Sequence, residues 1–305
     1  MIRSVAILSV GALLLIACID HVPQPRVGPV YDSISASLIT GLDREVEETS
    51  GLMVFNGNIW THNDSGGEAI LYQVDTTQGK VATRWNVVNA NNNDWEDISQ
   101  DSTYIYIADF GNNRGSRKNL QILKFPKPEH LDTGIGIIAD VISFEYEDQE
   151  IYPNSYNHNF DCESFISLGD SIILFTKNWD DNHSKTYMIP NIPGHHIAQR
   201  TGRFNTEGVI TSATFGKDRT EIVLLGYNFK NDHFSPFIWH LTAIKGSDIY
   251  GGQQKRYNIL PDNKQMEGIA YKGDGKYWIS SEARDDSPAA LWQVSIPQCI
   301  NPKSN

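Results

Sequence analysis

The chain has 305 residues, of which 40% are hydrophobic and 20% are charged, a composition typical of a globular protein with a sizeable core. Its net charge of -12 argues against nucleic-acid binding, because phosphate backbones are bound by basic surfaces. The acidic balance is compatible with a bound cation, a basic partner or simply a soluble surface.

Residues 1–18 have the layout of a secretory signal peptide. Arg3 precedes an apolar run that is shorter than the roughly 20 residues needed to span a bilayer. The end of this run, Leu15-Ile16-Ala17-Cys18, resembles the lipobox of bacterial lipoproteins. That resemblance implies a mature chain that begins at a lipid-modified Cys18 and is held to a membrane. A plain signal peptide or an uncleaved anchor stays open as an alternative.

Ile19 follows the cysteine where an inner-membrane retention signal would have Asp, so we expect an exported protein of the outer membrane or cell surface. The Pro-rich residues 19–33 predict an extended tether between the lipid and a folded domain. Cys162 and Cys299 could pair in an oxidising compartment, and the sequence leaves that open.

A repeated pattern of short strands follows the tether. Each repeat has an apolar strand, a turn with Gly or Asp, a second strong strand and a polar loop. In chain order the repeats are EETSGLMVFNGNIWTHNDSGG, NDWEDISQDSTYIYIADFGNN, DCESFISLGDSIILFTKNWDDN, GVITSATFGKDRTEIVLLGYNFKND and QMEGIAYKGDGKYWISSEARDD. A third strand follows each repeat, and a fourth (KVATRWNV, ADVISFEY, HIAQRTGRF, QQKRYNIL) follows all but the last.

Repeats of four short strands indicate an all-β fold, the β-propeller. We expect five four-stranded blades within residues 34–298, followed by a tail of residues 299–305. Six blades, or a pair of β-sandwiches, are the alternatives. The last repeat lacks a fourth strand, and the N-terminal segment SASLITGL (residues 35–42) is predicted to supply it. Closing the ring in this way removes an exposed sheet edge.

Carboxylates and amides recur at two positions of each repeat. The first two strands of a blade are antiparallel, so the start of one and the end of the other lie at the same face. We therefore expect these side chains to converge on one mouth of the channel. The first-strand residues are Glu48, Asp94, Glu96, Asp161, Glu163 and Glu267, and the second-strand residues are Asn63, Asp64, Asp109, Asn112, Asn113, Asn178, Asp180, Asn228, Asp232, Glu282 and Asp285. The matched position at the first strand holds Ser50, Glu96, Glu163, Ser212 and Glu267.

A ring of this kind offers hard oxygen donors, which Ca²⁺ prefers, whereas the His and Cys that zinc prefers are sparse there. Clustered carboxylates repel one another, so they raise one another's pKa or attract a cation. Turn formation is the alternative explanation for the Asp and Asn residues.

The strand starts at Glu96, Glu163 and Glu267, with Asn or Asp at the second-strand ends, resemble the calcium-dependent propeller hydrolases. These include gluconolactonase-like lactonases, paraoxonase-like arylesterases and esterase-like propeller phytases. NDWEDI with ADFGNN is also similar to secreted bacterial propeller lipoproteins. The resemblance covers residues 35 to 297 and differs in the apparent blade count. It implies Ca²⁺ bound by Glu96, Glu163 or Glu267 together with Asn113, Asn178 and Asn228, and the ring adds Asp109 as a ligand candidate.

Such a hydrolase would use the ion to polarise a lactone, ester or phosphoester while a side chain activates water. We expect His62 to be the base, with His233 second, and Glu163 to take part in catalysis. The first alternative is a non-catalytic propeller that binds a small molecule, a polysaccharide or an envelope protein. The second is a glycosidase that uses Glu96, Glu163 and Glu267, with carboxyl groups about 5 to 9.5 Å apart.

Overall fold

The structure is a computed structural model that describes residues 29–128 and 135–297. The chain divides into Met1–Val30 and Tyr31–Asn305, and the fold is that of the second unit. The expected signal peptide with Cys18, most of the expected tether, Cys299 and the expected tail lie outside the described residues. Among the described residues, no helix has the length and apolar character required to cross a membrane.

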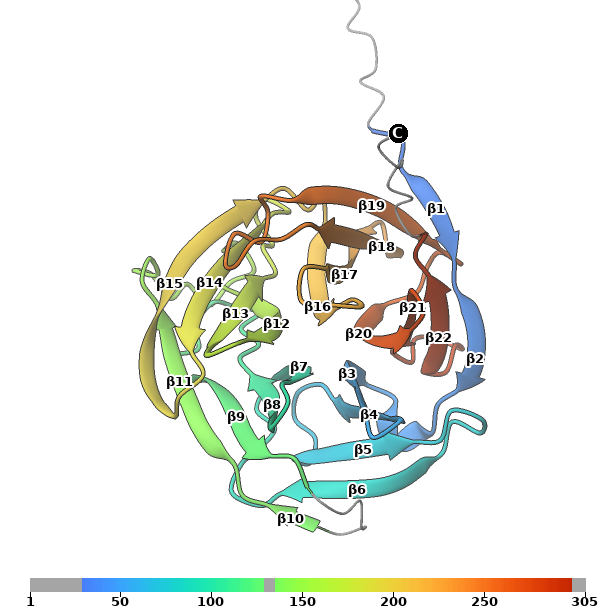
Figure 1. Ribbon diagram of the computed structural model, residues 1–305, viewed down its shortest axis with the longest axis horizontal. Coiled ribbons are helices and arrows are strands. Elements are labelled where there is room, and N and C mark those ends of the chain that lie inside the picture. Colours follow the sequence, from blue (N-terminus) through green and yellow to red (C-terminus); the bar gives the residue numbers. More distant parts are fainter. Residues whose placement is uncertain (1–28, 129–134, 298–305) are drawn as a thin grey trace, which may run out of the picture. The chain divides into compact units, whose positions relative to one another are not determined.

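Five four-stranded blades surround a common axis, with β3, β7, β12, β16 and β20 innermost (Figure 1). The first blade contains β3 (Thr49–Phe55), β4 (Asn58–Asn63), β5 (Ile70–Val74) and β6 (Val81–Val87). The second contains β7 (Trp95–Gln100), β8 (Tyr104–Asp109), β9 (Leu120–Pro126) and β11 (Asp140–Tyr146). The third contains β12 (Cys162–Leu168), β13 (Ser171–Thr176), β14 (Ser184–Pro190) and β15 (Gly194–Phe204).

The fourth blade contains β16 (Val209–Phe215), β17 (Ile222–Lys230), β18 (His233–Thr242) and β19 (Gln253–Leu260). The fifth contains β20 (Met266–Gly273), β21 (Lys276–Ser281), β22 (Ala290–Ser295) and the N-terminal β2 (Ser37–Gly41), which is antiparallel to β22. Ser37 lies opposite Gln293 in that pairing. The predictions of a five-bladed propeller and of an N-terminal strand that completes the last blade are therefore confirmed.

Additional parallel pairings protect several outer edges. β10 (Ile135–Ile137) pairs with β6, and β1 (Asp32–Ser35) pairs with β19. β11 pairs with β15, so the second and third blades form one continuous eight-stranded sheet. β1 begins within the residues that the sequence assigned to the tether. Covered edges are not available for pairing with another chain.

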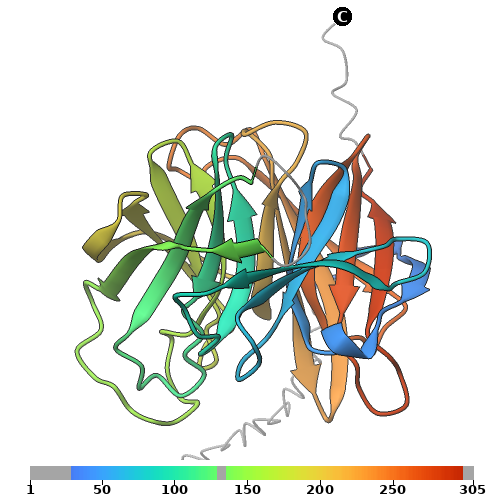
Figure 2. The same cartoon turned by 90° about the horizontal axis from the view of Figure 1, so that it is seen from below.

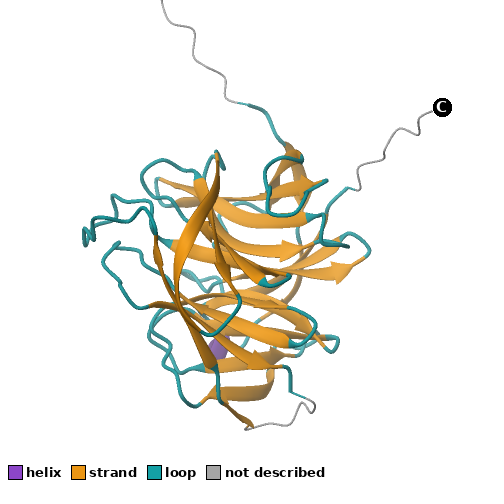
Figure 3. Ribbon diagram, turned by 60° about the vertical axis from the view of Figure 1, so that its left-hand side comes forward, coloured by secondary structure: helices purple, strands orange, loops and turns teal. Residues whose placement is uncertain are grey.

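Tight hairpin turns join the first two strands of several blades. Asn56 and Gly57 have φ values of 49° and 76°, and Asp274 and Gly275 have values of 52° and 69°. Two successive residues with positive φ are the geometry of a type I′ turn, which Asn-Gly and Asp-Gly favour. The only helix among the described residues is the 3-10 turn η1 (Arg44–Val46), drawn purple in Figure 3.

The hydrophobic core is divided among the blade interfaces. Each strand presents one face to the preceding blade and one to the next, so a separate apolar cluster fills each gap. In the cluster between the first and second blades, Trp60 and Trp85 of the first blade stack at 3.7 Å, and Trp95 of the second blade is fully buried. These rings therefore hold blades together. The strands run between two loop-bearing faces (Figure 2), and those faces are where a site can form.

Candidate metal centre

A β-bulge occurs near the start of every innermost strand. The register shifts by one residue in all five blades. The additional residue is Glu96, Glu163, Thr211 and Glu267 in the second to fifth blades, and in the first blade the shift falls at Ser50 and Gly51. A bulge bends the strand and re-aims its side chain. The repeated bulge thus explains why acidic residues at this position turn to one face. In the fourth blade the position holds Thr211, so the predicted match to Ser212 was wrong by one residue.

Acidic side chains gather at this face and influence one another electrostatically. We call them the carboxyl ring: Glu48, Asp64, Asp94, Glu96, Asp161, Glu163, Glu267 and Glu282. Burial, followed by the neighbouring charge of Glu163, raises the pKa of Glu96 well above its ordinary value. Burial and Asp64 raise the pKa of Asp94 to about 7, and burial and Glu267 raise that of Glu282 to about 9. Without a cation, several of these groups retain protons at neutral pH.

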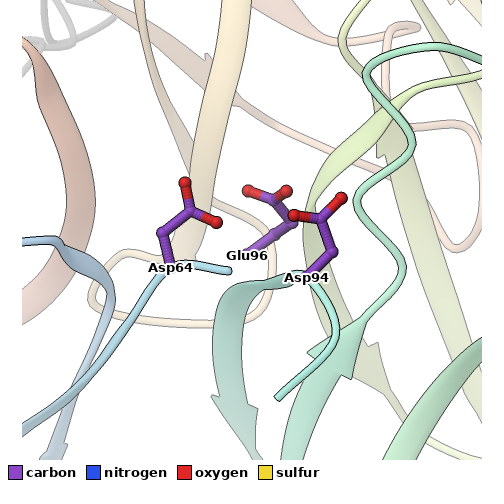
Figure 4. Close-up of side chains that lie close together, drawn as sticks. All are labelled: Asp64, Asp94 and Glu96. Atoms are coloured by element: carbon purple, nitrogen blue, oxygen red, sulfur yellow. The ribbon is translucent and has the colours of Figure 1, made fainter. Parts of the chain in front are cut away.

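Three members of the ring form a tight group that could hold a metal ion. Asp64 follows β4, Asp94 precedes β7, and Glu96 lies in the bulge of β7. One carboxylate oxygen from each lies within 4.8 Å of the others. In Figure 4 the Glu96 carboxyl group lies between those of Asp64 and Asp94. Of the three, only Glu96 was in the predicted ligand set, although all three were in the predicted ring.

Glu96 is the innermost member of this group and is only 4% exposed. Its Oε1 is buried and has no hydrogen-bond partner among the described residues. A Cβ at Gly111 would lie 1.9 Å from Oε1 and 2.5 Å from Cγ of Asp94. The absence of a side chain at Gly111 therefore allows the carboxyl groups of Glu96 and Asp94 to lie close to each other. A buried carboxylate oxygen without a donor is costly unless a cation or proton compensates it.

The other two predicted glutamates already have partners. Lys177 Nζ lies 2.6 Å from Glu163 Oε1, and both side chains are almost fully buried. Burial alone would lower the pKa of Lys177, but the carboxyl groups of Glu163, Glu267 and Asp161 raise it well above its ordinary value. Gln265 Nε2 donates to Glu267 Oε1 at 2.9 Å. Lys177 thus supplies one positive charge inside the ring.

Several predicted amide and carboxylate ligands are engaged in structural hydrogen bonds. Asp109 is fully buried and accepts bonds from Asn93, Arg117, Gln121 and the Asp94 amide. Asn178 is also fully buried: its Oδ1 accepts from Thr176 and its Nδ2 donates to Asp181.

The two remaining predicted amides are partly exposed. Asn113 lies after β8, and its backbone carbonyl accepts a bond from His158. Asn228 lies in β17, opposite Ser235.

The predicted base, His62, lies inside the protein. It has no exposed surface, its Nδ1 is 3.0 Å from the Asn63 carbonyl oxygen, and its ring packs edge-on against Trp95. Burial lowers its pKa to about 4. The second candidate, His233, is about half exposed and pairs with Asp262 at 2.7 Å. Neither histidine belongs to the set of three clustered carboxylates, Asp64, Asp94 and Glu96.

The sequence interpretation missed Asp97, which follows Glu96 in β7 and bonds to the innermost strands of two other blades. Its carboxylate accepts bonds from the Phe165 amide, the Ala213 amide and Ser212 Oγ, at 3.3, 3.4 and 3.0 Å. Ser212 Oγ in turn accepts from the Ile269 amide. We call this network the Asp97 junction, and it connects the innermost strands of four blades. Its only signal in the sequence was a second acid directly after a bulge glutamate.

No family model matches the chain, and no curated protein matches it. Similar solved structures include an exo-β-1,3-galactanase from Phanerochaete chrysosporium, with 15% identity, a TM-score of 0.38, and coverage of 64% of this chain and 45% of that one. A hypothetical protein from Leishmania major has 11% identity, a TM-score of 0.46 and coverage of 88% and 91%. A glycoside hydrolase has 10% identity, a TM-score of 0.46 and coverage of 84% and 61%.

The chain thus spans less than half the length of the galactanase. At these identities and TM-scores the similarities indicate no activity for the chain, and what it can do follows from its own side chains.

Proposed function

We propose that the protein binds one Ca²⁺ at the carboxyl ring through Asp64, Asp94 and Glu96, and that it is a metal-assisted hydrolase of uncharged esters or lactones. The observation that carries the proposal is the buried Oε1 of Glu96, which has no partner among the described residues. It lies in a group of three carboxylates whose oxygens are within 4.8 Å of one another.

The donor set fits a hard divalent cation. All three side chains are carboxylates, which favour Ca²⁺ and Mg²⁺, and the group contains no His or Cys. Ca²⁺ tolerates irregular geometry and accepts about 6 to 8 oxygens, so backbone carbonyls and water would complete its shell. Mg²⁺ demands a near-ideal octahedron, which three side chains from two neighbouring blades are less suited to provide.

The charge around the centre restricts the substrate. Apart from the three ligands, the ring carries Glu48, Asp161, Glu163, Glu267 and Glu282, and the nearby cations Lys177 and Arg117 are already paired with carboxylates. Because both nearby cations are paired, the ring offers a phosphoester no cationic partner besides the bound ion. An uncharged ester or lactone is compatible with it. When bound, the ion would polarise the carbonyl oxygen of such a substrate.

Within the chain, the roles divide by position. Asp64, Asp94 and Glu96 hold the cation, and Gly111 leaves space for their approach. Lys177 pairs with Glu163 at 2.6 Å, so Glu163 Oε1 already has a cation partner. A glycosidase would need two separated carboxyl groups that are free to exchange protons, so the tight grouping and the Glu163–Lys177 pair favour the metal over that alternative.

The test is calcium titration of the purified protein by calorimetry, with a parallel thermal melt. We expect saturable binding, with a dissociation constant of about 1 mM or lower, and a higher melting temperature. Glu96→Gln should weaken binding at least about tenfold. Glu145→Gln, the same change on the exposed outer strand β11, should leave it unchanged. Absence of binding at about 10 mM calcium would overturn the metal site.

The catalytic part of the proposal is tested separately. Hydrolysis of an aryl acetate and of a δ-lactone should depend on calcium and disappear in Glu96→Gln. Calcium binding without hydrolysis of either substrate would leave a non-catalytic, calcium-bound propeller as the function.

We further propose that the protein is exported and anchored by lipid on Cys18, with its ligand drawn from the cell envelope. The basis is the lipobox-like sequence, which lies outside the described residues. Cys18→Ala should abolish metabolic labelling with palmitate and release the protein from the membrane fraction. Unchanged labelling would contradict the assignment of Cys18.

A further inference from the structure

A cavity opens at the face opposite the carboxyl ring. Its volume is about 460 Å³, and its walls come from the second halves of the innermost strands. Leu52, Ile98, Ile166 and Ala270, from four different blades, line it but are at most 3% exposed. The partly exposed apolar lining is Val54, Phe215 and Tyr271. The Asp97 junction lies between this cavity and the carboxyl ring, so the two ends of the axis are separate sites.

The loop between β16 and β17 adds two cations to this cavity, Lys217 and Arg219. Arg219 Nη1 donates to the Ser167 carbonyl at 2.7 Å, and its guanidinium lies 4.8 Å from the centre of the Phe215 ring. The side chain is therefore held in place while its other donors stay available. Neither cation has a salt bridge with an acid among the residues that the structure describes.

The acids beside these cations have hydrogen-bond partners of their own. Asp101 accepts from the Tyr106 hydroxyl at 2.6 Å and from two amides of its own turn. Asp218 accepts from the amide and hydroxyl of Thr220 at 2.8 and 2.6 Å. The ammonium group of Lys127 donates to the Asp101 backbone carbonyl and also lies near the Asp101 carboxylate. Lys217, Arg219 and Lys127 outnumber Asp101 and Asp218 by one, so the side chains at this mouth carry a net positive charge, although the protein as a whole is acidic.

We propose that this cavity binds a small organic anion with an apolar body, of the class of a medium-chain monocarboxylate. The apolar body lies against Val54, Phe215 and Tyr271, the partly exposed apolar side chains of the cavity, where burial of hydrocarbon is favourable. The carboxylate is bound by Arg219 and Lys217, since a guanidinium matches a carboxylate with two parallel hydrogen bonds. A neighbouring cavity of about 590 Å³ shares Lys217 with the first and provides room for a longer ligand.

The experiment is calorimetric titration of the purified full chain with octanoate, and with octylammonium as the matched cation. Octanoate should bind with a dissociation constant of about 10 μM to 1 mM, and octylammonium should not bind. Lys217→Gln with Arg219→Gln should weaken octanoate binding at least about tenfold. Lys217→Gln alone changes an exposed side chain, so it should fold normally and weaken binding about threefold.

The controls separate this site from general charge effects and from the carboxyl ring. Lys230→Gln removes an equal charge from the other end of β17 and should leave octanoate affinity unchanged. Glu96→Gln should also leave it unchanged, because that residue lies beyond the Asp97 junction. The proposal is overturned if octanoate fails to bind at about 10 mM, if octylammonium binds equally well, or if Lys230→Gln weakens binding as much as the double substitution.

Discussion

Replacement of Asp97 by Ala tests whether one buried carboxylate holds the centre of the propeller together. The substitution removes the acceptor of the Phe165 and Ala213 amides, which belong to two other blades. The Ile98 amide also donates to Asp97, so three amides lose their acceptor. Each buried amide left unpaired costs about 1 to 3 kcal/mol, so the three cost about 3 to 9 kcal/mol. Removing a carboxylate from a fully buried position offsets part of this cost. We expect a net loss of about 3 to 4 kcal/mol of unfolding free energy.

The loss should be visible in the melting temperature. Because 1 kcal/mol corresponds to about 2 to 4 °C in domains of 150 to 250 residues, we expect Asp97→Ala to melt roughly 10 °C lower in a calorimetric scan. Asp140→Ala, at the exposed start of β11, is the control and should melt within about 1 °C of the unchanged protein. If Asp97→Ala melts as the control does, the Asp97 junction does not stabilise the ring and the reasoning fails.

Three further predictions concern the carboxyl ring. The pKa of Glu282 is raised to about 9, so the folded state binds a proton that the unfolded state releases, and stability without calcium should fall as pH rises from about 4.5 to 9. Glu282→Gln should flatten that slope in urea unfolding curves measured at several pH values. Lys177→Met leaves Glu163 buried without its cation and should cost about 3 to 5 kcal/mol in the same assay, and a Lys177→Met, Glu163→Gln double variant should recover most of it. Gly111→Ala should abolish calorimetric calcium binding because its Cβ has no room, whereas Gly67→Ala, where a Cβ meets nothing closer than 3.9 Å, should bind normally.

The blade architecture was predictable because each repeat carries local signals. Alternating apolar runs and the Asn56-Gly57 and Asp274-Gly275 turns define hairpins from neighbouring residues alone. The segment 35–42 was identified as the closing strand because the last repeat lacked one. The parallel additions β1 and β10 were not predicted, since each is short and pairs with a strand that is distant in sequence.

The position of the site at one face of the propeller was predictable, but the residues that form it were not. The sequence placed acids at one face, yet hydrogen-bond partners decide which of them are free for a metal. Asp109 and Asn178 have suitable chemistry but are occupied by neighbours from their own blades. The one-residue error at Thr211 has a different cause, because a bulge shifts the register without any distinctive residue in this blade.

The pairing of β2 with β22 has a consequence for how the protein is made. Ser37 must find Gln293, so β2 is synthesised before every other strand of the five blades and its partner strand follows all of them. Until the two strands pair, each of them leaves an open edge, which makes the incompletely folded chain vulnerable to aggregation. Contacts of such large sequence separation also slow folding. A chain truncated before Ala290 would therefore contain four potentially complete blades and still lack a closed ring.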